Sequence, residues 1–281
     1  MRTVAALLFV SLLAAARTVP AQPSSNLDDY VLFAEEILRA DALLVPCGDI
    51  GVNSTSGLFR ETGGITVAGN CVGNTARMDM VGSCGALYAN FTVKPTNPPI
   101  PFTPPVLTGS LASNCGFPSA PFGCNLAAPV TVNAGDTVTL PPGVYGHVTV
   151  KGGFDEFMAP NPGVLRLSGG TYVFCNVKLS RFAEIRALAA TEMRVDGKLK
   201  MTSDNFFGPD TGNVASDFTV FVNGTKVRYS RESEVTAKLC APQANCGLLD
   251  GGTHFGGAWC RKVKVRDLTF TCASPSGAFV D

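Results

Sequence analysis

Short segments in which one polar residue separates two apolar residues recur through the sequence from Val130 onward. In an extended chain the two apolar side chains of such a triplet point to one side, and the middle side chain points to the other. Gly, Pro, Asn and Asp separate the triplets at short intervals, which is typical of an all-β fold. The triplets are Val148-Thr149-Val150, Leu165-Arg166-Leu167, Val177-Lys178-Leu179, Met193-Arg194-Val195, Leu199-Lys200-Met201, Val227-Arg228-Tyr229 and Val263-Lys264-Val265.

An internal repeat favours a coil of stacked rungs over a sandwich or a barrel. Residues 177–187, with the sequence VKLSRFAEIRA, align without gaps with residues 227–237, VRYSRESEVTA. Gly143-Val144-Tyr145 and Gly170-Thr171-Tyr172 form a second, shorter repeat. A solenoid requires such repetition, because each rung buries its apolar face only against its neighbours. The sequence therefore predicts an all-β, single-stranded parallel β-helix (β-solenoid) with loop excursions.

The N-terminus has the pattern of a signal peptide. Arg2 precedes an apolar run from Val4 to Ala16. Val19-Pro20-Ala21 follows and resembles the small-residue pattern that precedes a cleavage site. Spanning a bilayer needs roughly 20 apolar residues, and Arg17 interrupts this run, so cleavage is favoured over a membrane anchor. We expect residues 1–21 to be removed and the remaining chain to be secreted, periplasmic or located at the cell surface, without a membrane span.

A proline-rich stretch divides the remaining chain. Residues 94–125 contain several prolines, which cannot donate the hydrogen bonds of a sheet. We expect a disulfide-containing insertion outside the sheet, between N-terminal β-rungs in residues 22–93 and the main β-solenoid in residues 126–281. The stretch from Phe33 to Ala42 also fits a short helix, and whether the N-terminal rungs stack on the main coil stays open.

The chain has ten cysteines, an even number that predicts disulfides formed in an oxidising compartment. Zinc ligation is disfavoured because the chain has no Cys-x-x-Cys motif and only two histidines, and we expect no metal site and no cofactor. Spacing does not fix the connectivity, although it favours the local pairs Cys115–Cys124 and Cys240–Cys246, and Cys260 and Cys272 are candidates for closing the C-terminal rung. The disulfide candidates are Cys47, Cys71, Cys84, Cys115, Cys124, Cys175, Cys240, Cys246, Cys260 and Cys272.

The basic residues of several triplets make a candidate face for an anionic polymer. The chain as a whole balances 22 basic against 22 acidic residues, which disfavours a nucleic-acid binder. Outward-pointing cations on one face would nevertheless form a ladder that attracts anionic glycans or cell-wall polymers. A solvated surface neutralised by nearby Glu184 and Glu234 is the simpler interpretation. The candidate residues are Lys178, Lys200, Arg228, Lys262, Lys264 and Arg266.

Several motifs together resemble a family of exported bacterial proteins of unassigned function. Gly48 to Asn53 resembles that family's opening rung, so the resemblance covers most of the chain after residue 21. It implies a right-handed β-helix in a surface or pilus-associated context and supplies no catalytic residues. The many cysteines and the proline-rich insertion depart from the plainer members. The motifs are residues 140–146 (LPPGVYG), 165–172 (LRLSGGTY), 195–199 (VDGKL), 241–242 (AP) and 256–258 (GGA).

We therefore expect a secreted or cell-surface structural or binding protein without a catalytic centre, whose partners are a surface glycan, another extracellular polymer or a second copy of itself. The alternative is a polysaccharide lyase or hydrolase, which needs clustered carboxylates. Asp155-Glu156 is the only adjacent acidic pair in the main coil, and a solvated loop explains it more simply. An ice- or mineral-binding surface would need flat ranks of threonines in register, which the sequence does not show. The glycine-rich segment 251–257 lacks the Lys-Ser/Thr of a phosphate-binding loop.

Overall fold

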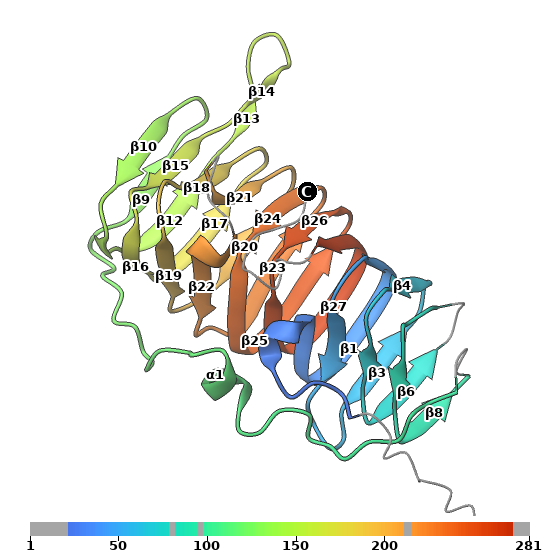
Figure 1. Ribbon diagram of the computed structural model, residues 1–281. Coiled ribbons are helices and arrows are strands. Elements are labelled where there is room, and N and C mark those ends of the chain that lie inside the picture. Colours follow the sequence, from blue (N-terminus) through green and yellow to red (C-terminus); the bar gives the residue numbers. More distant parts are fainter. Residues whose placement is uncertain (1–21, 79–81, 95–97, 211–214, 272–281) are drawn as a thin grey trace, which may run out of the picture.

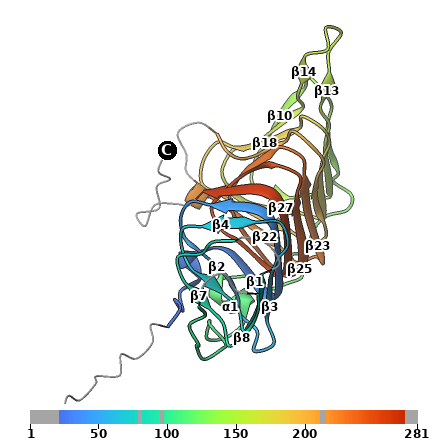
Figure 2. The same ribbon diagram turned by 90° about the vertical axis from the view of Figure 1, so that its right-hand side faces the viewer.

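The computed structural model describes residues 22–78, 82–94, 98–210 and 215–271, so the predicted signal peptide and Cys272 lie outside the described residues. The chain forms a right-handed parallel β-solenoid; the triplets and the repeat predict the parallel coil, and the resemblance implies its right-handed sense. Within the described residues, 25 strands join into one hydrogen-bonded sheet that winds around a common interior. Figure 1 shows the strands stacked along one axis, and Figure 2 shows the coil from one end.

The solenoid has three sides, A, B and C. Long bent strands cross more than one side: β1 (Tyr30–Val45) and β27 (Ala258–Thr271) cross all three, and β25 (Lys238–Leu249) crosses sides A and B. The other strands each lie on one side.

Side A contains β11 (Gly143–Val144), β16 (Gly170–Phe174), β19 (Thr191–Val195), β22 (Phe218–Val222), β2 (Asp49–Val52), β5 (Cys71–Val72) and β7 (Leu87–Tyr88). Side B contains β9 (Val130–Val132), β12 (His147–Val150), β17 (Asn176–Leu179), β20 (Leu199–Met201), β23 (Lys226–Ser230), β3 (Leu58–Glu61), β6 (Thr75–Met78) and β8 (Phe91–Val93). Side C contains β10 (Thr137–Leu140), β15 (Val164–Leu167), β18 (Glu184–Ala187), β21 (Phe206–Pro209), β24 (Ser233–Thr236), β26 (Gly252–Phe255) and β4 (Ile65–Val67).

A few short elements lie outside this sheet. The strands β13 (Gly153–Phe154) and β14 (Pro160–Asn161) form an antiparallel hairpin that projects from the body. One α-helical turn, α1 (Leu111–Asn114), and two 3-10 turns (Leu27–Asp29 and Ala215–Asp217) complete the described elements.

The order of rungs in the stack differs from their order in the chain. Strand β27 pairs in parallel with β1, and β1 pairs on its other edge with β2, β3 and β4. The N-terminal rungs therefore extend the stack beyond the last strand of the chain (Figure 1). The stretch from Phe33 to Ala42 belongs to β1 and is extended, not helical.

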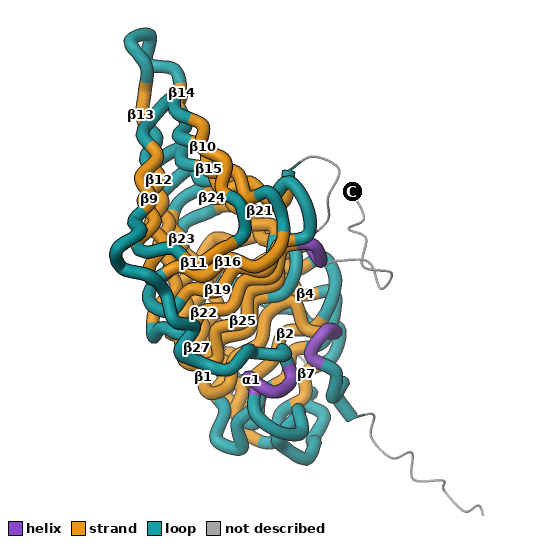
Figure 3. Tube along the Cα trace, turned by 90° about the vertical axis from the view of Figure 1, so that its left-hand side faces the viewer, coloured by secondary structure: helices purple, strands orange, loops and turns teal. Residues whose placement is uncertain are grey.

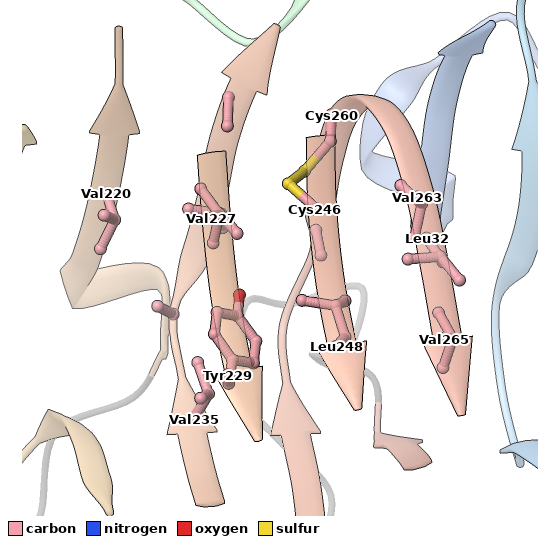
Figure 4. Packing of buried hydrophobic residues seen from close by; sticks show 14 of the residues in the cluster. Leu32, Val220, Val227, Tyr229, Val235, Cys246, Leu248, Cys260, Val263 and Val265 are labelled. Carbon is pink, nitrogen blue, oxygen red and sulfur yellow. A yellow bond between two sulfur atoms is a disulfide. The ribbon is translucent and has the colours of Figure 1, made fainter. Parts of the chain in front are cut away.

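The interior is filled by the apolar residues of the triplets. Leu179 is fully buried and Tyr229 is 4% exposed, and valines and leucines from successive rungs pack in rows along the axis (Figure 4). Each fully buried aliphatic side chain contributes roughly 1.5–3 kcal/mol relative to an exposed one. The rows thus hold together strands that are too short to be stable alone.

Residues 98–125, which we call the strap, run along the outside of side A and connect β8 at one end of the stack with β9 at the other (Figures 1 and 3). Outward-pointing apolar residues of side A, including Phe33, Phe221 and Trp259, are buried beneath it. Leu107 and Leu111 of the strap pack into the same cluster. The strap therefore gives the coil a second, smaller apolar core.

Two disulfides attach the strap to the coil. Cys115 bonds to Cys240 in β25, and Cys124 bonds to Cys175, which follows β16. Two further bridges, Cys71–Cys84 and Cys246–Cys260, join neighbouring parts of the coil. Cys47 is also disulfide-bonded.

The expected local pairs Cys115–Cys124 and Cys240–Cys246 are wrong. Cys260 bonds to Cys246 in the neighbouring rung, and the other candidate for closing the C-terminal rung, Cys272, lies outside the described residues. Stacking joins cysteines of neighbouring rungs, and the strap adds two long-range pairs, so the shortest spacings in the sequence did not predict the pairing.

Candidate functional site

A row of basic side chains runs along side B and takes one residue from each of seven rungs. Parallel pairing aligns Lys178 with Lys200 and Lys200 with Arg228. After one glycine the row resumes at Lys264, which is in register with Arg39 of β1. Arg39 aligns in turn with Arg60 of β3, and Arg60 with Arg77 of β6. We call these residues the basic row; it consists of Lys178, Lys200, Arg228, Lys264, Arg39, Arg60 and Arg77.

Alternation along each strand produces the row. Every member lies between two residues whose side chains face the interior, such as Leu199 and Met201 around Lys200, so its own side chain lies on the outer face of the coil. Arg60 is half-buried there, and the other members are exposed. From Lys178 to Arg77 the row is about 34 Å long, at about 4.8 Å per rung. At its Lys178 end the same outward positions hold Thr149 and Thr131.

Five cations of the row have no ion-pair partner among the described residues. Lys178, Lys200, Arg228, Lys264 and Arg39 are exposed, and no carboxylate within the described ranges forms an ion pair with any of them. Like charges stacked at the spacing of β-strands repel one another and produce a positive potential along this side. The expected neutralising residues Glu184 and Glu234 lie on side C, in β18 and β24.

Two of the residues selected from the sequence lie beside the row rather than in it. Lys262 forms an ion pair with Glu36, with 3.1 Å between Nζ and Oε2, and Arg266 pairs with Asp250. Both cations flank Lys264 within β27. Their charges are locally compensated, so they contribute less to the potential than the central row does.

The structure adds Arg39, Arg60 and Arg77 to the site, which the sequence analysis missed. Their segments carry the same signal, because Leu38-Arg39-Ala40 and Ala76-Arg77-Met78 are apolar-polar-apolar triplets. Local alternation could not show, however, that these strands stack on β27.

Gly247 occupies the one row position without a side chain, between Arg228 and Lys264. A hollow of about 590 Å³ opens there, and its lining includes Lys198, Lys226, Arg228 and Lys264. A second hollow of about 240 Å³ adjoins it and is lined by Arg39, Lys262 and Lys264, among others. No Asp or Glu lines either hollow.

The acidic pair Asp155-Glu156 lies in the turn between β13 and β14, in the hairpin that projects from the body of the coil (Figure 3). The carboxylate of Asp155 accepts hydrogen bonds from the backbone N–H groups of Phe157 and Ala159, at 2.9 and 2.8 Å. It therefore stabilises the turn of the hairpin. Among the described residues, no three His, Cys, Asp or Glu side chains converge as metal ligands would.

The glycine-rich segment 251–257 forms strand β26 with its preceding turn, and it turns His254 into the interior. The imidazole lies between the rings of Tyr229 and Phe270, with ring centroids 6.0 and 5.0 Å away. Burial lowers the pKa of His254 to about 4, against a smaller opposing effect of the Ala237 and Gly257 backbone, and burial raises the pKa of Tyr229. This segment therefore belongs to the core and not to a surface site.

No family model matches the chain, and a search of the curated proteins found no match.

Proposed function

We propose that this protein is a secreted or cell-surface binding protein, and that the basic row on side B holds an extended anionic glycan along the solenoid axis. The observation that carries the proposal is the register of the row itself. Lys178, Lys200, Arg228, Lys264 and Arg39 align in register on one exposed side, with a single interruption at Gly247.

The spacing of the row suits a linear polymer. A cation at most row positions, about 4.8 Å apart, complements a chain that carries an acidic group on successive units. Such a ligand meets many weak contacts at once, and multivalent contact raises affinity above that of any single pair. A compact anion would engage only a small part of the row.

The cost of the row to folding also supports a binding role. Stacked like charges destabilise a sheet. An acidic residue at every second position of the row would remove that repulsion. Residues that lower stability without a structural role are typical of functional surfaces.

The remainder of the molecule is consistent with a location where such glycans occur. The disulfides of the described residues are compatible with an extracellular or periplasmic protein. Within the described residues, no helix has both the length and the apolar character needed to cross a bilayer.

Binding of immobilised polyuronate and sulfated polysaccharide, with neutral dextran as the comparison, tests the proposal. Arg228→Gln removes one charge of the row, and Arg166→Gln is its matched control, because Arg166 is also an exposed triplet arginine but lies on side C. We expect Arg228→Gln to weaken binding about two- to fivefold and high salt to weaken it further. Equal behaviour of the two variants would contradict the proposal.

The same polysaccharides test the enzymatic alternative. Release of shortened or unsaturated products by the wild-type protein, lost in Asp155→Ala or Glu156→Ala, would replace the binding role with a lyase or hydrolase.

A further inference from the structure

We propose that the hollow at Gly247 is a subsite that receives one acidic sugar unit, with its carboxylate or sulfate group between Arg228 and Lys264. This inference rests on the proposed glycan-binding function. It names the place on the basic row where one unit of the glycan is recognised. The hollow is the larger of the two recesses described beside the row, at about 590 Å³ against about 240 Å³.

The fold does not require glycine at position 247. A Cβ built there would meet only Leu249, at 3.7 and 3.8 Å, which is ordinary contact. Its φ also lies outside the left-handed region that favours glycine. By contrast, a Cβ at Gly197 or Gly224 would come within 2.6 Å of backbone atoms, so those glycines are explained by close packing of the chain.

A glycine inside a strand weakens the strand, because glycine loses more backbone entropy on folding than other residues and contributes no side-chain packing. Where neither packing nor a positive φ accounts for it, a glycine in a strand indicates close approach of a ligand. Gly247 meets both conditions, and it lies one rung from a cation on each side.

The size of the gap fits a sugar unit. Removing one side chain from the row leaves Arg228 and Lys264 about 10 Å apart, twice the usual strand spacing. An anionic group in the middle of this gap lies near both cations, and the Arg228 guanidinium presents the planar pair of donors that carboxylate and sulfate accept.

The lining also suits the rest of the unit. Asn245 and Thr225 offer polar groups for sugar hydroxyls, and the half-buried Leu249 offers an apolar surface for the C–H face of the ring. Lys198 and Lys226 add positive charge at the margin, and the absence of carboxylates from the lining favours an anionic occupant.

Filling the hollow tests the inference without removing any charge. Gly247→Val places a β-branched side chain in the gap, and Gly247→Ala fills only a small part of it. The matched control is Thr149→Val, which introduces the same side chain at a row position outside the hollow. We expect all three variants to fold, with thermal midpoints of the glycine variants equal to or above that of the wild type.

Affinity is measured by calorimetry with oligogalacturonate, with a sulfated oligosaccharide and with a neutral oligosaccharide of equal length. We expect Gly247→Val to weaken acidic-ligand binding about tenfold, equivalent to about 1.4 kcal/mol, Gly247→Ala to weaken it less, and Thr149→Val to leave it unchanged. The ligand with the larger loss identifies the group as carboxylate or sulfate.

The outcomes separate this inference from the proposed function. If Arg228→Gln weakens binding but Gly247→Val does not, the hollow is no subsite, and the basic row remains a binding face. If neither variant changes binding, both proposals fail. If Gly247→Val weakens binding of an acidic protein or of nucleic acid while acidic oligosaccharides do not bind, the assignment to a sugar is overturned.

Discussion

Arg39 of β1 lies directly beside Lys264 of β27, at the junction where the N-terminal rungs meet the last strand of the coil. Two like charges therefore face each other across the parallel pair on which the stacking of the two parts of the chain depends. Both side chains are exposed, so water moderates the repulsion without removing it.

Replacing Arg39 with Gln should stabilise the protein. Like charges on directly opposed strand residues cost roughly 0.2–1 kcal/mol, and Gln retains most of the aliphatic stem. We expect the free energy of unfolding in urea to rise by about this amount at low ionic strength. Salt screens the repulsion, so the difference should shrink at high salt; a destabilised variant would show that Arg39 has a partner that offsets its charge.

His254 should make the protein sensitive to acid. Its pKa is about 4 in the folded protein and about 6.5 in an unfolded chain. Between these values the unfolded chain binds the proton more strongly, so stability is fully present above about pH 6.5 and falls as the pH drops to about 4. The loss amounts to about 3 kcal/mol.

Urea unfolding at several pH values measures this effect. His254→Leu keeps an apolar side chain of similar size and should flatten the profile between pH 6.5 and 4. His147→Gln is the control, because His147 is exposed on side B and hydrogen-bonds only to Asn176 among the described residues. An unchanged profile in His254→Leu would mean that other groups cause the acid sensitivity.

Asn53 should be needed to hold the strap. Its Oδ1 accepts a hydrogen bond from the backbone N–H of Leu107, at 2.8 Å, and the side chain is 3% exposed. Asn53→Ala leaves that buried N–H without its acceptor, which costs about 1–3 kcal/mol. Asn90→Ala, which removes a similar contact with Phe102 at an exposed position, should cost less.

Fluorescence gives a local readout of strap release. Trp259 is the only tryptophan of the chain, is 5% exposed under the strap and donates from Nε1 to the carbonyl of Tyr30 at 2.9 Å. A red shift of its emission in Asn53→Ala, before global unfolding, would confirm local detachment. Cooperative loss of all signals at one urea concentration would contradict it.

The long-range disulfides should stabilise the fold more than the local ones. Cys124–Cys175 closes a loop with a sequence separation of 51, against 14 for Cys246–Cys260. From loop-closure entropy, we expect the free energy of unfolding to fall by about 4 kcal/mol when both cysteines of Cys124–Cys175 are replaced by Ser, and by about 3 kcal/mol for Cys246–Cys260. Thermal unfolding of the two double variants tests the order, and the reverse order would indicate that the strap is attached mainly by its apolar contacts.

Much of the fold was predictable because burial alternates along each short strand. The triplets around Lys178, Lys200, Arg228 and Lys264 predicted which residues point inward and which point outward. The repeat of 177–187 at 227–237 indicated stacking. In the structure both segments run from side B to side C, the first as β17 and β18 and the second as β23 and β24.

The rest of the site depends on relations that local patterns do not encode. Arg39 joins the row only because β1 pairs with β27, and that pairing joins strands from opposite ends of the described chain. Gly247 has no side chain to reveal its outward position. The same lack of long-range information made the cysteine pairs unpredictable, since the strap brings Cys115 to Cys240.

The position of β1 in the stack determines when the molecule can be completed. During synthesis or export the N-terminal rungs emerge first, yet one edge of β1 has no partner until β27 has arrived. Until then these rungs present unpaired strand edges that are prone to pair with other chains. Folding must wait for contacts of high sequence separation, which makes it slow. A chain truncated before residue 258 would lose this junction, and with it the alignment of cations from the two halves into one line.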